Sequence, residues 1–301
     1  MKIKQFFKNS ACGAAIGIGM IIPGVSGGTI AVIFKIYDRL IGALGNLRKD
    51  FKANFGFLFS ILLGAAIGFA AMYFPLKWAL ERAPLPTYLL FAGLMIGSLP
   101  DLFKESKKFG FNKINILSIA MPFVTVIAIC ILNLLISAGN ADLSANMSIW
   151  GYFAVFGVAM LASCALVIPG ISGSMLLMIL GYYAPVLGLI SGLLTDFWHS
   201  ALVLAVFAAG LLIGFFSIAK LMKYLLNKLS RGTHWAIIGF VLASIPALLI
   251  VLDYSSAPLD AAHIIVGCIL FVLGIIGAYA LTAYAEAKMK KSTNEAERTE
   301  N

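Results

Sequence analysis

Two stretches of the chain share one unusual pattern: Pro-Gly, a β-branched residue, Ser and Gly inside an apolar run. The first reads MIIPGVSGGTIAVIF from Met20, and the second reads LVIPGISGSMLLMIL from Leu166. A continuous membrane helix disfavours Pro-Gly in its interior, because Pro removes a backbone hydrogen bond and Gly has a low helix propensity. The pattern therefore predicts a chain that is interrupted twice, at equivalent places.

The composition places this chain in a membrane. Of its 301 residues, 61% are hydrophobic and only 12% are charged, whereas a soluble domain is about half apolar and about a quarter charged. The formal net charge of +9 comes from Lys and Arg in short loops between apolar runs. That distribution is typical of the positive-inside rule, so we expect no nucleic-acid partner. The four Cys and three His have no metal-ligand spacing, and we expect no metal and no cofactor.

The two motifs belong to an internal duplication. Pro23 matches Pro169, an offset of 169 − 23 = 146 residues. Without gaps, the same offset aligns Gly24 with Gly170, Ser26 with Ser172, Gly27 with Gly173, Gly64 with Gly210, Gly68 with Gly214, and Ser98-Leu99-Pro100 with Ser244-Ile245-Pro246. Composition alone does not align such motifs in register. We predict a first repeat over residues 1–137, a second over 148–285, and a polar cytoplasmic tail over 286–301.

Six apolar stretches are long enough, or nearly so, to cross a bilayer: 53–74, 87–100, 114–137, 200–220, 234–252 and 262–284. The segment before the first break is different. Residues 11–22 would form a helix of about 18 Å, which is too short for an apolar core of about 30 Å. We therefore expect a re-entrant helical hairpin at about 11–35 and a second one at about 150–190. Each repeat then consists of one hairpin and three transmembrane helices.

The alternative is a kinked span through each break, and the charge of the loops discriminates between the two. Three crossings per half invert the second repeat, whereas four would leave the halves parallel. With the basic N-terminus inside, the hairpins place the basic segments 35–52, 101–113 and 220–232 inside. They place 138–147 and 181–199, which lack Lys and Arg, outside. Only the segment 75–86 fits the positive-inside rule poorly. The sequence thus predicts an all-α polytopic protein with an inverted-topology repeat, both termini cytoplasmic, and an N-terminus that is retained although it mimics a signal peptide.

Each break also starts a helix, and this makes it a candidate anion site. Ser26 and Ser172 are placed to cap the following arm, and the glycines leave the N–H groups of its first turn uncovered. Helix N-termini of this kind bind phosphate. The candidate phosphate-binding residues are Pro23, Gly24, Ser26, Gly27, Gly28, Thr29, Pro169, Gly170, Ser172, Gly173 and Ser174. The alternative is that the small residues only let helices approach closely.

Six further residues have two interpretations each. Ser98 and Ser244 either cap helices locally or line the cavity between the breaks. Lys35, Arg39, Lys77 and Lys223 either extend to the membrane interface, as lysines and arginines near span ends commonly do, or pair with an anion.

The paired PGVSGGT and PGISGS segments, followed by GSLP and ASIP, resemble the bacterial and archaeal polyprenyl-phosphate transporter family, long described as a domain of unknown function. The resemblance covers about residues 8–285. It implies a plasma-membrane flippase, not an enzyme, that returns undecaprenyl phosphate from the outer to the inner leaflet for cell-wall precursor recycling. The second copy departs from the first at Ser174 and Met175, where the first has Gly28 and Thr29.

Two other functions compete with this one. A transporter or channel for a small soluble anion would use the same breaks without an opening to lipid. A membrane enzyme acting on lipid phosphates would need clustered acid–base groups. The scattered positions of His199, His234 and His263 disfavour the enzyme.

Overall fold

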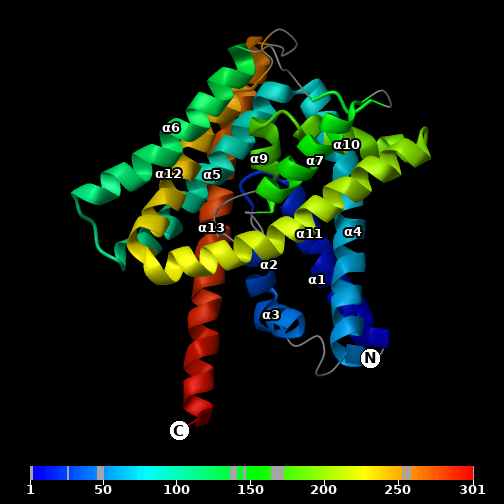
Figure 1. Cartoon of the computed structure of the whole chain (residues 1–301). Coiled ribbons are helices and arrows are strands. Elements are labelled where there is room, and N and C mark those ends of the chain that lie inside the picture. The colour runs from blue at the N-terminus through cyan, green and yellow to red at the C-terminus, as the bar shows by residue number, and fades with distance from the viewer. Residues whose placement is uncertain are drawn as a thin grey trace.

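The computed structural model describes residues 3–25, 27–45, 51–135, 141–144, 147–163, 173–252, 254 and 259–300. Over this part of the chain the regular structure is entirely helical (Figure 1). The first half contains α1 (Ile3–Ile21), α2 (Gly27–Ile33), α3 (Tyr37–Gly45), α4 (Phe51–Arg82), α5 (Pro84–Lys107) and α6 (Lys113–Leu135). The second half contains α7 (Ile149–Ala162), α9 (Gly173–Ile179), α10 (Tyr183–Gly192), α11 (Phe197–Lys228), α12 (Ser230–Ile250) and α13 (Ala261–Glu300).

Helix boundaries and local hydrogen bonds recur between the halves. Adding 146 to the bounds of α2 and α4 gives the bounds of α9 and α11. The Thr87 hydroxyl donates to the carbonyl oxygens of Ala79 and Ala83, and the Thr233 hydroxyl donates to those of Leu225 and Leu229. Each residue of these hydrogen bonds in the first half lies 146 positions before its equivalent in the second half. The similarity of the two halves therefore extends from sequence motifs to backbone geometry.

Six helices are long and apolar enough to cross a membrane: α4, α5, α6, α11, α12 and α13. They overlap the six stretches that the sequence indicated, so the expectation of an all-α polytopic membrane protein is confirmed. Their outward faces carry large apolar side chains, for example Met121 on α6, Phe216 on α11 and Leu273 on α13, all more than half exposed. Exposing these apolar faces to water would cost free energy, whereas in a bilayer they face lipid.

Several helices extend beyond the range expected from hydropathy, and α4 and α11 continue to Arg82 and Lys228. α1 begins at Ile3 rather than near residue 11, and at 1.5 Å per residue its 19 residues span about 28 Å. α5 continues through Pro100 to Lys107, and α13 continues past residue 284 to Glu300. The expected arm of about 18 Å was therefore too short. Hydropathy marks only the apolar part of a helix, and polar turns can prolong it at the interface.

Glycines bring α1 and α4 into backbone contact. A Cβ added to Gly17 would lie 2.0 Å from the Ala65 carbonyl oxygen, and one added to Gly68 would lie 2.0 Å from that of Ala14. The equivalent pair in the second half, α7 and α11, repeats this contact, since a Cβ on Gly210 would lie 2.5 Å from the Phe156 carbonyl oxygen. Small residues at both interfaces allow close van der Waals packing, which drives helix association in lipid.

The repeat mates α5 and α12 form the centre of the molecule. α5 packs against α13 and α12, and α12 also packs against α6, so each central helix pairs with a span from the other half. The buried core follows from this arrangement and includes Phe91 and Met95 on α5 and Val241 and Leu248 on α12. Both labelled chain ends lie in the lower part of Figure 1, where α2 and α3 lie between α13 and α4.

Candidate functional site

The first break is buried in protein. α1 ends at Ile21 and α2 begins at Gly27, and between them Gly24 has a φ of +86°, a conformation that glycine adopts without strain. Pro23 is buried. A Cβ on Gly24 would lie 3.0 Å from the Leu94 Cβ and 3.1 Å from the Met95 backbone nitrogen. The break is therefore packed against the central helix α5, and a larger residue at Gly24 would be both strained and crowded.

A long-range hydrogen bond ties this break to the second half of the chain. The hydroxyl of Tyr183, at the start of α10, donates to the carbonyl oxygen of Ile21 at 2.8 Å. Both residues are buried, with exposed fractions of 5% and 1%. A carbonyl at an interrupted helix end is costly to bury without a donor. Tyr183 supplies that donor, and no sequence pattern predicted this pair.

The first turn of α2 is only partly covered. Gly28 is exposed, and Gly27 and Thr29 are half-buried. A Cβ on Gly27 would lie 3.0 Å from the Met20 Cγ and 3.2 Å from the Ile16 Cγ2, so this glycine also lets α2 approach α1. The first N–H groups of any helix lack intrahelical acceptors. Ser26 lies outside the described residues, and its capping role stays a prediction.

The second break lies mostly outside the part of the chain that the structure describes. Pro169, Gly170 and Ser172 fall in the undescribed stretch 164–172. Gly173 begins α9 and is half-buried, and Ser174 is buried. The contribution of this break to a phosphate site therefore stays a prediction.

The two Ser-x-Pro serines bond within their own helices. The Ser98 hydroxyl donates to the Met95 carbonyl oxygen at 2.7 Å, and the Ser244 hydroxyl donates to that of Phe240 at 2.8 Å. Both lie inside helices, so the expectation of helix caps is wrong. Hydroxyls in membrane helices commonly bond to the preceding turn in this way. Their role as cavity-lining residues stays a prediction.

The basic candidates have different surroundings. Lys35 is exposed and has a φ of +55°, and its repeat mate Gly181 has a φ of +76°. The Arg39 guanidinium lies 4.3 Å from the centroid of the Phe57 ring. Lys77 lies 3.9 Å from the carboxylate of Glu81 one turn away. The side chain of Lys223 is outside the described part. Lys35 stands out because an exposed lysine occupies a backbone conformation for which the second copy uses glycine.

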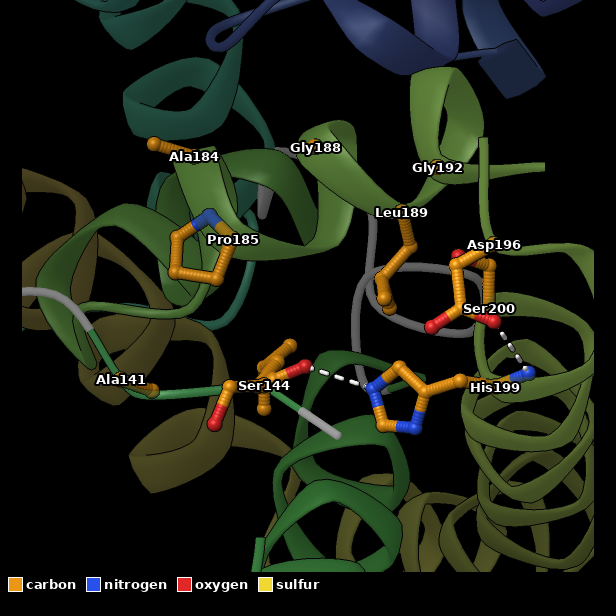
Figure 2. Close-up of a pocket in the computed structure, with 11 residues that line it drawn as sticks. Ala141, Ser144, Ala184, Pro185, Gly188, Leu189, Gly192, Asp196, His199 and Ser200 are labelled. Atoms are coloured by element: carbon orange, nitrogen blue, oxygen red, sulfur yellow. Dashed lines mark hydrogen bonds between the residues drawn. The ribbon is translucent and has the colours of Figure 1, made fainter. Parts of the chain in front are cut away.

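A cavity of about 530 Å³ lies elsewhere, beside the loop 141–144 and the first turn of α11 (Figure 2). The His199 ring points across it, with Nε2 at 2.8 Å from the Leu143 carbonyl oxygen. The side chain of Asp196 caps α11 by accepting from the His199 backbone N–H at 3.4 Å. Ser144, Ser200 and small residues of α10 complete the wall.

Sequence reasoning did not single out this cavity. Its lining contains one carboxylate and one imidazole but no Lys or Arg, and none of the predicted phosphate residues contributes to it. Since the chain has no Lys or Arg from 114 to 219, no cationic side chain from that segment can add to it. Because the Asp196 carboxylate already caps the N-terminus of α11, the cavity is not an anion site of the kind expected at the breaks.

Comparisons with known proteins identify the family. The chain matches a family model described as undecaprenyl phosphate translocase-like over residues 16–266. It is 30% identical over 276 residues to a protein of Staphylococcus aureus named polyprenyl-phosphate transporter, covering 90% of this chain and 95% of that one. It is 28% identical over 261 residues to a protein of the same name from Vibrio cholerae, covering 82% of this chain and 79% of that one. No solved structure matches.

These matches cover both halves and both breaks, and they confirm the resemblance that the motifs indicated. The relatives are named transporters, not enzymes, in agreement with the scattered His residues. The chain belongs to the undecaprenyl phosphate translocase-like family.

Proposed function

We propose that the protein moves undecaprenyl phosphate, or a related polyprenyl phosphate, from the outer to the inner leaflet of the plasma membrane, where the carrier re-enters cell-wall precursor synthesis. The observation that carries this proposal is the Pro-Gly motif repeated in the two halves, together with the burial of the first break between α5 and α10. Irregular backbone at membrane depth is tolerated where protein buries it or a wet cavity receives it. The names of the two relatives support the substrate class.

The head group binds at the breaks through backbone N–H groups. A phosphate monoester is compact and carries up to two charges, and the first turns of α2 and α9 offer partial positive charge. The exposure of Gly28 at the start of α2 supports access of a ligand to this turn. The residues proposed to contact phosphate are Gly24, Ser26, Gly27, Gly28 and Thr29 in the first copy and Gly170, Ser172, Gly173 and Ser174 in the second, with Pro23 and Pro169 shaping the turns. Lys35 and Arg39 add full positive charge near the cytoplasmic end of the first hairpin.

The two halves have opposite orientations in the membrane, each with a re-entrant hairpin and three spans, and both termini are cytoplasmic. Three exposed tryptophans support this topology: Trp78, Trp150 and Trp198, all more than 60% exposed. Each lies in or beside a segment that the hairpin topology places outside, and tryptophan is enriched at membrane interfaces. An inverted repeat gives a transporter two related conformations that open to opposite sides.

A reconstituted assay tests the substrate and separates it from a small soluble anion. Proteoliposomes would receive a fluorescent short-chain polyprenyl phosphate in the outer leaflet, and the fraction of fluorescence that becomes protected from an impermeant quencher would report transport. We expect protein-dependent movement of the lipid and no uptake of radiolabelled inorganic phosphate. Uptake of inorganic phosphate without movement of the lipid would replace our proposal by the small-anion alternative.

A matched pair of variants tests the backbone mechanism. Gly27→Leu would cover the N–H groups of α2, whereas Gly277→Leu adds the same side chain at an exposed position where a Cβ meets nothing within 4 Å. We expect the first to abolish transport and the second to preserve it at equal membrane levels. Ser26→Ala removes the predicted cap, a loss of about 0.5–2 kcal/mol, and should weaken binding by roughly two- to thirtyfold. Normal transport by inserted Gly27→Leu would rule out the backbone mechanism.

A further inference from the structure

The C-terminal end of α2 has a defined hydrogen-bond pattern. The Lys35 N–H donates to the Val32 carbonyl oxygen at 2.9 Å, and the Ile36 N–H donates to that of Ala31 at 3.0 Å. With Lys35 in the left-handed region, this is a Schellman motif. The motif uses the carbonyls of Ala31 and Val32 but not that of Ile33, the last residue of α2.

The carbonyl of Ile33 accepts a hydrogen bond from the far end of the chain. Its donor is the ammonium group of Lys288 on α13, 255 residues away. Lys288 is half-buried, and its Nζ also lies 5.4 Å from the centroid of the Tyr284 ring. A cation at a helix C-terminus is stabilised both by the bond and by the helix dipole. Lys288 therefore completes the cap that the Schellman motif leaves open.

A second contact fixes the same part of α13. The carboxylate of Glu286, two residues before Lys288, pairs with the ammonium group of Lys104 on α5. Glu286 is the more buried partner, with a side-chain exposed fraction of 28%. The segment of α13 around 284–288 is thus bound on one side to the central helix α5 and on the other to α2.

The lysine itself is not repeated in the first half. α6, the repeat mate of α13, ends at Leu135, which corresponds to Leu281 at the offset of 146. The position that matches Lys288 is Asp142, in the loop before α7. The second copy has its own Schellman motif, in which the Gly181 N–H bonds to the Met178 carbonyl oxygen at 3.0 Å and the Tyr182 N–H bonds to that of Leu177 at 2.8 Å. The first half therefore has no lysine at the equivalent position, although the neighbouring Ala141 N–H donates to the Gly181 carbonyl oxygen at 2.9 Å.

We propose that Lys288 is a positioning residue for transport, which fixes α2 in one orientation against α13. A helix of seven residues has little stability of its own, so its orientation depends on the contacts at its ends. Since α2 follows the first break, its orientation decides how that break faces the head group. This inference rests on the proposed function, because it assigns Lys288 a role in binding the same phosphate.

Hydrogen exchange tests the contact without a ligand. Lys288→Met keeps most of the stem beside Tyr284 but removes the donor, whereas Lys288→Arg keeps a donor. Lys108→Met is the matched control, since Lys108 is an exposed lysine that pairs with Glu105 on its own helix. In purified full-length protein, we expect amide exchange in residues 27–36 to rise about two- to thirtyfold in Lys288→Met. Lys288→Arg and Lys108→Met should match the wild type, and unchanged exchange in Lys288→Met overturns the proposal.

Native mass spectrometry with undecaprenyl phosphate tests the role. A smaller fraction of correctly oriented α2 lowers the apparent affinity by that fraction. Lys288→Met should therefore bind more weakly in proportion to the lost fraction of correctly oriented α2, and Lys288→Arg should restore binding. If the wild type binds and Lys288→Met binds equally well, only the positioning role is wrong. If the wild type itself does not bind the lipid, the proposed function falls and this inference falls with it.

Discussion

The contrast between Lys35 and Gly181 gives a prediction that separates stability from function. Both residues occupy the left-handed position of a Schellman motif, with φ values of +55° and +76°. The left-handed conformation costs a residue with a Cβ about 1–2 kcal/mol. Glycine avoids this strain but loses about 0.5–1 kcal/mol of stability through extra chain entropy on folding. Lys35→Gly should therefore stabilise the protein by roughly 0.5–1 kcal/mol. Gly181→Lys should destabilise it by at least a similar amount.

The expected effect of Lys35→Gly on transport is opposite to its effect on stability. A strained residue that is retained where the repeat mate is glycine points to a function for its side chain. If Lys35 adds charge for the phosphate at the inner end of the first break, Lys35→Gly should lower transport while raising stability. Lys35→Arg keeps both the strain and the charge, so it should leave stability and transport near the wild-type values.

The measurement combines unfolding in mixed detergent micelles, followed by tryptophan fluorescence, with the proteoliposome assay on equal amounts of protein. A Lys35→Gly variant that is no more stable than the wild type would contradict the strain argument. A variant that is more stable and transports normally would show that Lys35 is not a partner of the head group.

Three further outcomes are expected. In a Cys-free background, a Cys at Ser144 should react with an impermeant maleimide on intact cells and a Cys at Asn227 only after lysis; labelling of both from outside would contradict the inverted repeat. Gly68→Ala places a Cβ 2.0 Å from the Ala14 carbonyl oxygen and should greatly reduce folded protein, whereas Gly157→Ala, with nothing within 4 Å, should be tolerated; equal yields would refute the close contact of α1 with α4. Tyr183→Phe leaves the Ile21 carbonyl unpaired and should cost about 1–3 kcal/mol, measured by micellar unfolding; a loss below about 0.5 kcal/mol would mean that another donor replaces the hydroxyl.

The sequence by itself determined the class of protein, the six long apolar helices and the place of the first interruption. These features are local. An apolar run of about 20 residues predicts a span wherever it occurs, and Pro-Gly changes the backbone at its own position. The offset between Pro23 and Pro169 could be read directly because duplicated residues keep their spacing, and the helix bounds of α2 and α9 follow it.

Hydropathy was less informative where a helix leaves the apolar core. α1, α5 and α13 all extend past their apolar parts, because a hydrogen-bonded helix does not end where lipid ends. The roles of Ser98 and Ser244 were also open from sequence alone, since a hydroxyl can bond locally or point away from its helix. Rotamer and packing decide between the two, and here both hydroxyls bond to the preceding turn.

Only the tertiary structure decided what surrounds the first break. Gly24 packs against α5, Tyr183 bonds to Ile21, and Lys288 bonds to Ile33 across 255 residues. Periodicity and capping rules relate residues within a few positions of each other, so they carry no information on pairs this distant. Such pairs depend on which helices become neighbours, and that is settled by the packing of whole helix faces: α5 against α13, and α6 against α12.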